Sequence, residues 1–217
     1  MDYPTLKKLV RQGEGLHLEF KLKANHPEKI VREAVAFANS EGGLLLIGVD
    51  DDKTIRGLKY ASEDEYSLVE AFAKYCSPPI DYLLEKVPVE ANREVLVFTI
   101  PKSENVHFVI ENFETGWGQA YVRVEDKSLK ASREMREILR GRRRNRNVQF
   151  QYGTKEEILM KYLETHRQIT VDEFSRTAKI PRRVASRTLV LLVLARVLQI
   201  QPNPVHADAF TFTEEDT

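Results

Sequence analysis

Apolar and polar positions alternate near the start of the chain. From Leu16 to Lys23, every second residue is Leu or Phe and those between are His, Glu or Lys, which is typical of a half-buried β-strand. Apolar residues then recur at helical spacing from Pro27, and this helix ends at Asn39-Ser-Glu-Gly-Gly43. Leu44 to Val49 is a short apolar run that predicts a buried strand. The first fifty residues therefore predict a strand–helix–strand unit.

The remaining pattern separates a mixed segment from a helical one. A capping box at Ser62 begins a predicted helix that ends at Ser77, and a short helix is expected from Ala131 to Gly141. The predicted strands of the mixed segment are Asp81–Val87, Glu94–Ile100, Asn105–Phe113 and Gln119–Val124. The predicted helices of the second segment begin at Thr154, Thr170 and Ile180-Pro181, and Ala209–Thr213 alternates like a strand.

This order predicts an α+β protein with two domains. Residues 1–147 are expected to form an α/β domain that ends in an Arg-rich linker. Residues 148–217 are expected to form a small winged helix-turn-helix domain, because three helices and then a β-hairpin follow in that order.

Carboxylates lie on or next to the first two predicted strands. Glu19 and Lys21 share one strand face, Glu14 lies just before that strand, and Asp50 lies at the exit of the second. If the two strands are neighbours, these groups meet at one edge, and oxygen ligands of this kind suit Mg²⁺ or Mn²⁺. The alternatives are a solvated Glu19–Lys21 pair and an ordinary turn at Asp50.

Three motifs resemble the Schlafen AlbA-type DNA-binding domain family over about the first two-thirds of the chain. They are Glu14-x4-Glu19-Phe-Lys21, Ala36-Phe-Ala-Asn-x-x-Gly-Gly43 and Gly48-Val-Asp50. In the animal Schlafen proteins that cleave RNA, an acidic triad matches Glu14, Glu19 and Asp50 residue by residue. The resemblance thus implies a nuclease alternative in which these three hold the metal and Lys21 assists. The chain departs from those proteins, because it has one such lobe and a single Cys, so their zinc site cannot be present.

Arginines form two groups in the second half of the chain. The run 140–146 contains Arg142, Arg143, Arg144 and Arg146, and could follow a phosphate backbone or serve as a solvated linker. Arg182, Arg183, Ser186 and Arg187 lie at the start of the third predicted helix of the second domain. In a recognition helix, side chains at this position contact base edges and phosphates. Such layouts also serve as dimer modules.

Charge and hydrophobicity refine this picture. Residues 1–130 carry 17 Lys and Arg against 22 Asp and Glu, a net charge of −5, and residues 131–217 carry 16 against 11, a net charge of +5. A basic half favours contact with nucleic acid.

The stretch Leu189–Ala195 is apolar on every side of its predicted helix, which predicts a buried dimer seam. The lone Cys76 is expected in the core, and no apolar run is long enough to span a membrane.

The interpretation that combines these features is a cytoplasmic homodimeric DNA-binding protein that regulates transcription, with no cofactor and no membrane partner. RNA is the alternative nucleic acid. A Mg²⁺- or Mn²⁺-dependent endoribonuclease is the second hypothesis, and a non-catalytic dimerisation or assembly module is the third.

Overall fold

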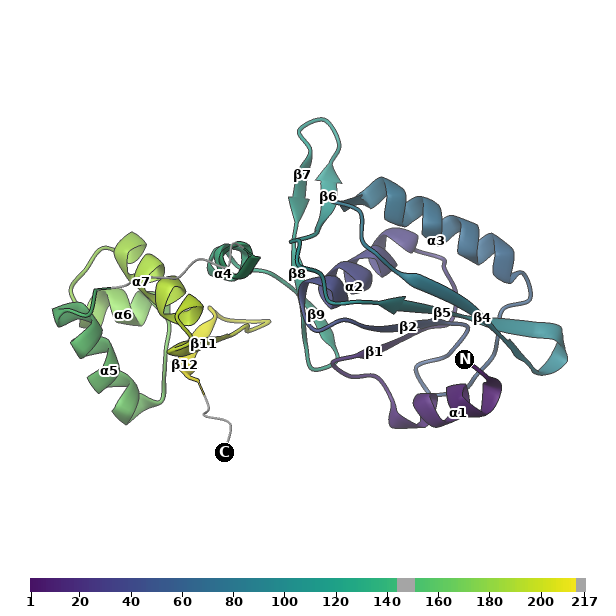
Figure 1. Ribbon diagram of the computed structural model, residues 1–217, viewed down its shortest axis with the longest axis horizontal. Helices are drawn as coiled ribbons and strands as arrows, with labels where there is room; N and C mark the ends of the chain where they lie inside the picture. The colour runs from purple at the N-terminus through teal and green to yellow at the C-terminus, as the bar shows by residue number, and fades with distance from the viewer. Residues whose placement is uncertain (144–150, 214–217) are drawn as a thin grey trace. The chain divides into compact units, whose positions relative to one another are not determined.

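The chain folds into two compact units, Met1–Lys130 (unit 1) and Ala131–Thr217 (unit 2). The computed structural model describes residues 1–143 and 151–213 (Figure 1). Helices and strands occur in both units, and the mixed α+β class predicted from the sequence is confirmed.

Unit 1 contains helices on both sides of a central sheet. Its elements are α1 (Tyr3–Gln12), β1 (Leu18–Lys21), α2 (Pro27–Asn39), β2 (Gly43–Ile47), α3 (Ala61–Tyr75), β3 (Cys76–Ser77), β4 (Leu83–Val89), a 3₁₀ turn (Glu90–Asn92), β5 (Arg93–Ile100), β6 (Phe108–Asn112), β7 (Trp117–Gln119), β8 (Tyr121–Val124) and β9 (Lys127–Lys130).

The central sheet of unit 1 has the strand order β1-β2-β5-β4. The strands β1 and β2 are parallel neighbours, with Glu19 opposite Leu45 and Lys21 opposite Ile47, and α2 forms the crossover between them. The other pairs of this sheet are antiparallel. The strand–helix–strand prediction for the first fifty residues is therefore confirmed, and its two strands are neighbours, which was the condition for the predicted meeting of the carboxylates.

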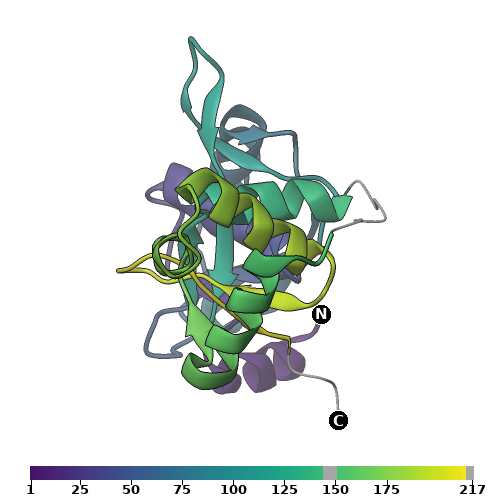
Figure 2. The same cartoon turned by 90° about the vertical axis from the view of Figure 1, so that its left-hand side faces the viewer.

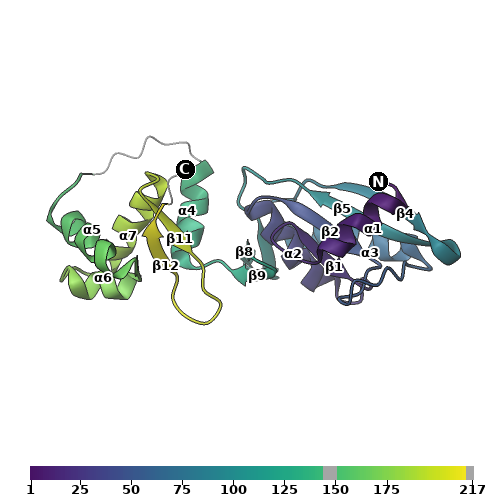
Figure 3. The same ribbon diagram turned by 90° about the horizontal axis from the view of Figure 1, so that it is seen from below.

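The two faces of this sheet pack against different helices because side chains alternate along each strand. In β2, Leu45 and Ile47 pack with α2 and α3, whereas Leu46 packs with Leu6 and Val10 of α1. All of these side chains are almost fully buried. Figure 3 shows α1 crossing the face of the sheet opposite to α2 and α3. The apolar run in β2 thus reflects a strand that is covered on both faces.

Two small β-structures complete unit 1. The strands β3, β6 and β7 form an antiparallel sheet, and β8 and β9 form a hairpin that lies beside α2. The sequence predicted one strand over Gln119–Val124; it is divided at Ala120 between β7 and β8.

Unit 2 consists of helices and one small antiparallel sheet with the strand order β10-β12-β11. Figure 2 shows its helices in green and its β-hairpin in yellow. Its elements are α4 (Arg133–Arg143), α5 (Thr154–His166), β10 (Gln168–Ile169), α6 (Val171–Thr177), α7 (Arg182–Leu194), β11 (Leu198–Gln201) and β12 (Ala209–Phe212).

The order of α5, α6, α7 and the β11–β12 hairpin agrees with the predicted order of elements. Leu159, Phe174, Leu189 and Phe210 bring these elements into one core. The designation of this unit as a winged helix-turn-helix domain remains a proposal.

The boundary between the units differs from the prediction, which placed it between residues 147 and 148. The chain divides after Lys130, because α4 packs against α7 and Ile138 joins the core of unit 2. The prediction instead assigned this helix to the first domain, since it preceded the Arg-rich segment.

Local signals at helix ends were less reliable than the apolar pattern. The capping box at Thr170 is present, since Thr170 N–H donates to the Glu173 carboxylate at 2.8 Å. The predicted box at Ser62 is not formed, because α3 already begins at Ala61.

Within the described parts of the chain, no helix is both long and apolar enough to cross a bilayer.

Candidate functional site: the acidic cluster and the arginine face

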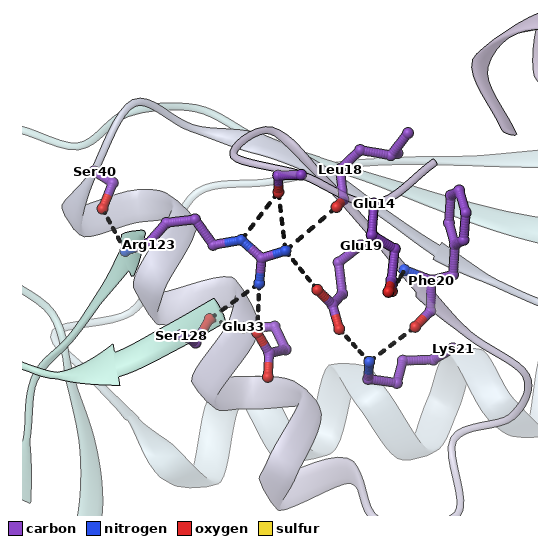
Figure 4. Close-up of polar contacts among 10 residues, drawn as sticks. Glu14, Leu18, Glu19, Phe20, Lys21, Glu33, Ser40, Arg123 and Ser128 are labelled. Carbon is purple, nitrogen blue, oxygen red and sulfur yellow. Dashed lines mark hydrogen bonds and ion pairs between the residues drawn. The ribbon is translucent and has the colours of Figure 1, made fainter. Parts of the chain in front are cut away.

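Glu14, which precedes β1, lies close to Glu19 and Lys21 of that strand (Figure 4). The Glu14 carboxylate accepts a hydrogen bond from Phe20 N–H at 2.8 Å, which ties the preceding loop to the strand. Lys21 donates to the Glu19 carboxylate and, at 2.8 Å, to the Phe20 carbonyl. The shared strand face predicted for Glu19 and Lys21 is confirmed by their ion pair.

Arg123 of β8 is the cation around which this cluster is built. Its side chain is fully buried, and Nη2 lies 2.6 Å from Glu19 Oε2. The same guanidinium donates to the carbonyls of Gly15, at 2.9 Å, and Leu18, at 3.3 Å, and lies over the Phe37 ring. These contacts join β8 to the loop before β1 and to β1 itself (Figure 4).

Glu33 of α2 is the second carboxylate on Arg123. Arg123 Nη1 lies 3.0 Å from Glu33 Oε2, and the hydroxyl of Ser128 in β9 donates to the same oxygen. One guanidinium therefore connects α2, β1 and the β8–β9 hairpin. Breaking a buried ion pair is strongly destabilising because it leaves a charge without compensation.

Burial and like charge perturb two carboxyl groups of the cluster. The pKa of Glu33 is raised above its usual value, first by burial and then by the negative charge of Glu19. The pKa of Glu14 is also raised, mainly by burial, although its hydrogen bond from Phe20 N–H acts in the opposite direction. Both shifts favour the protonated form, and Arg123 counteracts this for Glu33.

Asp50 does not complete a metal site with Glu14 and Glu19. Its carboxylate lies 3.8 Å from Arg56 Nε and caps the turn through Asp51 N–H. Within residues 1–143 and 151–213, no group of three His, Cys, Asp or Glu side chains is placed to hold one metal ion. Arg123 already supplies a buried positive charge to Glu19. The donor set expected for Mg²⁺ or Mn²⁺ is therefore not formed by these residues.

The Ala36–Gly43 motif connects α2 to β8, the strand that carries Arg123, and to His107, which lies just before β6. The Asn39 amide donates to the carbonyls of His107 and Tyr121, both at 2.9 Å, and its oxygen accepts from His107 N–H at 2.8 Å. Ser40 Oγ accepts from Arg123 N–H at 2.8 Å. The motif thus positions β8, and with it the guanidinium of Arg123.

The arginines at the start of α7 are exposed, with one of them paired. Arg182 Nε lies 2.7 Å from the Asp172 carboxylate of α6. Arg183 and Arg187 are exposed, and within the described residues neither has an ion pair with a carboxylate. They lie four positions apart and therefore on the same side of the helix.

Ser186 is not an exposed contact residue, in contrast to the prediction. It is only 4% exposed, and its hydroxyl donates to Glu134 Oε1 of α4 at 2.6 Å. Its neighbour Arg187 is exposed because it lies on another side of the helix. Ser186 therefore fixes α4 to α7.

The Arg-rich run 140–146 lies partly outside the described residues. Arg142 is exposed near the end of α4. Arg143 is the last residue of that helix, whereas Arg144 and Arg146 lie outside the described residues. The proposed phosphate contact of this run stays a prediction.

Most of the apolar stretch Leu189–Ala195 is buried within unit 2, and Leu191, Leu194 and Ala195 are half-buried. Leu189, Val190, Leu192 and Val193 are at most 5% exposed and belong to the core of that unit. The inference of a dimer seam assumed that one small domain could not bury them, and it did not include α4. The stretch therefore gives no support to a dimer.

A sequence model of the family described as Schlafen, AlbA_2 matches residues 14–132, which is more than half of the chain. The chain belongs to the Schlafen AlbA_2 family. The matched region begins at Glu14 and includes Arg123, so it contains the carboxylates of the acidic cluster and the arginine that pairs with them. The family resemblance inferred from the motifs is confirmed.

Two solved structures are similar to this Schlafen AlbA_2 protein. One is the N-terminal domain of a protein from Nitrosomonas europaea described as related to the ATP-dependent DNA helicase RecG; its identity is 22%, its TM-score is 0.38, and the match covers 45% of this chain and 71% of that one. The other is the DIP2311 protein from Corynebacterium diphtheriae, with 16% identity, a TM-score of 0.39, and coverage of 55% and 25%. The chain thus spans about a quarter of the length of DIP2311.

Membership in the Schlafen AlbA_2 family suggests a nucleic-acid-binding domain.

The sequence analysis did not predict that Arg123 and Glu33 belong to the acidic cluster of Glu14, Glu19 and Lys21. A signal was available for Arg123, because it alternates with the apolar Val122 and Val124 on a predicted strand. A charged residue in such a strand needs a partner if its face is buried.

Proposed function

We propose that this Schlafen AlbA_2 protein binds duplex DNA through the start of α7 and acts as a homodimeric transcriptional regulator. The observation that carries the proposal is the exposure of Arg183 and Arg187 on one side of α7, where within the described residues no carboxylate neutralises them. Unpaired guanidinium groups are suited to phosphate, which they bind in bidentate geometry.

The distribution of charge also favours unit 2 as the contact surface. Residues 131–217 have a net charge of +5, and residues 1–130 have a net charge of −5. Because DNA binding depends on local positive charge, unit 2 attracts the phosphate backbone and unit 1 repels it. The position of α7 directly after α6 supports its role as a recognition helix.

The acidic cluster has a different part in this proposal. Arg123 joins α2, β1 and β8 from within unit 1, and it leaves Glu19 already paired. The cluster then stabilises the AlbA-type fold, and the exposed Arg183 and Arg187 make the contacts with DNA.

Fluorescence anisotropy with a labelled duplex tests the contact surface. The Arg183→Gln/Arg187→Gln variant should bind DNA more weakly, and the slope of log affinity against log salt should fall in magnitude by about 2, since each phosphate contact contributes about 0.9. The control is Arg167→Gln/Arg196→Gln, which removes the same charge from exposed positions of unit 2 outside α7. Equal weakening in both variants would show that only net charge matters and would remove α7 from the contact role.

The oligomeric state needs a separate measurement. Sedimentation velocity at micromolar concentration should report a dimer, because a two-fold dimer presents two recognition helices to half-sites one turn of DNA apart. A monomer both alone and on a palindromic duplex would contradict the homodimer. Binding to one defined operator in preference to random duplex would support the regulatory role, and equal affinity for both would argue against it.

A further inference from the structure

A pocket of about 320 Å³ lies within unit 2, between α4 and α7. Helix α4 contributes Arg133 and Glu137 to its wall. Helix α7 contributes the remaining lining residues, which are Arg183, Ser186, Arg187, Val190 and Leu191. The hydrogen bond from Ser186 to Glu134 holds the two helices together at this place. The pocket therefore has two walls that are fixed to each other.

The lining carries an excess of positive charge. Its three arginines face a single carboxylate, that of Glu137, which lies 3.0 Å from Arg133 Nε. Arg183 and Arg187 then remain without a carboxylate partner among the described residues, one helical turn apart on the same wall. Two guanidinium groups at this spacing can bind one doubly charged anion.

Two residues that line the same pocket are apolar. Val190 is 5% exposed and Leu191 is half-buried, and both lie on α7 about one turn beyond Arg187 and two turns beyond Arg183. A volume near 300 Å³ is at the lower end for sites that hold small organic molecules, whereas it exceeds what one phosphate group needs. The ligand that fits has a dianionic head and a short apolar or aromatic body.

We propose that this pocket binds a small organic phosphate monoester, with its phosphate on Arg183 and Arg187 and its apolar body against Val190 and Leu191. Because these arginines are also the proposed DNA contacts, such a ligand competes with DNA for them and makes DNA binding responsive to a metabolite. This regulatory part rests on the proposed function, whereas binding of the phosphate monoester does not.

Isothermal titration calorimetry of the full chain with three probes tests the pocket. Phenyl phosphate should bind at least fivefold more tightly than inorganic phosphate, because the ring buries apolar surface, and phenol should not bind. In Arg183→Gln/Arg187→Gln, phenyl phosphate should bind about a hundredfold more weakly, since each lost charge-assisted hydrogen bond contributes about tenfold. The Arg167→Gln/Arg196→Gln control should bind like the wild type.

The outcomes separate this proposal from the proposed function. Equal affinity for phenyl phosphate and inorganic phosphate, equal loss in both double variants, or no heat with phenyl phosphate would each overturn the pocket. In a second arm, phenyl phosphate should displace labelled duplex DNA from the wild type at constant ionic strength. Phenyl phosphate binding without any DNA binding would keep the pocket and refute the proposed function. Binding of both at the same time would refute the competition.

Discussion

Replacing Arg123 by Met tests whether one buried guanidinium holds unit 1 together. Met has a similar length and no charge, so the change removes the cation and leaves most of the apolar volume. In the wild type, the side chain is fully buried and lies 2.6 Å from Glu19 and 3.0 Å from Glu33. The variant therefore retains the buried Glu19 carboxylate and the partly buried Glu33 carboxylate without their common cation.

The expected cost is about 3–5 kcal/mol of the free energy of unfolding at neutral pH, which is typical of removing one partner from a buried ion pair. The lost hydrogen bonds to the Gly15 and Leu18 carbonyls contribute to the same loss. With a urea dependence of about 2 kcal/mol per molar, the midpoint of unfolding should fall by roughly 2 M.

The loss should also depend on pH. The pKa of Glu33 is already raised by burial and by Glu19, and without Arg123 it should rise further. A carboxyl group with a raised folded-state pKa contributes stability that is present below its unfolded-state pKa and is lost as pH rises through the folded-state pKa. The destabilisation by Arg123→Met should therefore be smaller at pH 5 than at pH 7.5.

The fluorescence of Trp117 provides the assay, because it is the single tryptophan of the chain and lies in β7 of unit 1. Urea titrations of the wild type and Arg123→Met at both pH values give the comparison. Arg56→Met is the matched control, since Arg56 is about half exposed and its pair with Asp50 is 3.8 Å long; it should cost less than about 1 kcal/mol. An Arg123→Met variant that unfolds at the wild-type midpoint would refute the reasoning.

Three further predictions concern other buried groups. Asn39→Ala should lower the stability of unit 1 by about 2–4 kcal/mol, because it leaves buried backbone groups of His107 and Tyr121 unpaired. Faster amide hydrogen exchange in β6 and β8, next to these residues, is the measurement. Burial raises the pKa of the Cys76 thiol to about 12, so at pH 8 the folded protein should react with a disulfide reagent about a thousandfold more slowly than the urea-unfolded chain. Leu192→Glu should unfold unit 2, since this side chain is 1% exposed in its core, and a folded monomer by circular dichroism and sedimentation would contradict this.

Much of the secondary structure could be predicted from the apolar pattern. The strands and the helix of the first fifty residues were found because the periods of two and 3.6 are local properties of the chain. The family could be recognised for a similar reason: its motifs are short and each depends on neighbouring residues. Helix α1 was missed, although Asp2 caps it through Thr5 N–H at 2.9 Å and Pro4 lies in its first turn.

The candidate sites depended on contacts between distant parts of the chain. Arg123 and Glu19 are 104 positions apart, and Glu134 and Ser186 are 52 apart. No local period relates such pairs, so the sequence alone suggested a metal for the first cluster and an exposed contact residue for Ser186. The position of α4 against α7 also explains why most of Leu189–Ala195 is buried without a second copy of the chain.

The sequence by itself therefore determined the order and type of most elements, the family and the opposite charges of the two halves. The tertiary structure decided which charged groups are partners and which remain free. The physical reason is that burial and pairing of a charge depend on where the chain brings distant segments together. Arg123 is buried and paired with carboxylates of two other segments, β1 and α2, whereas Arg183 and Arg187 remain exposed beside a pocket formed by two helices.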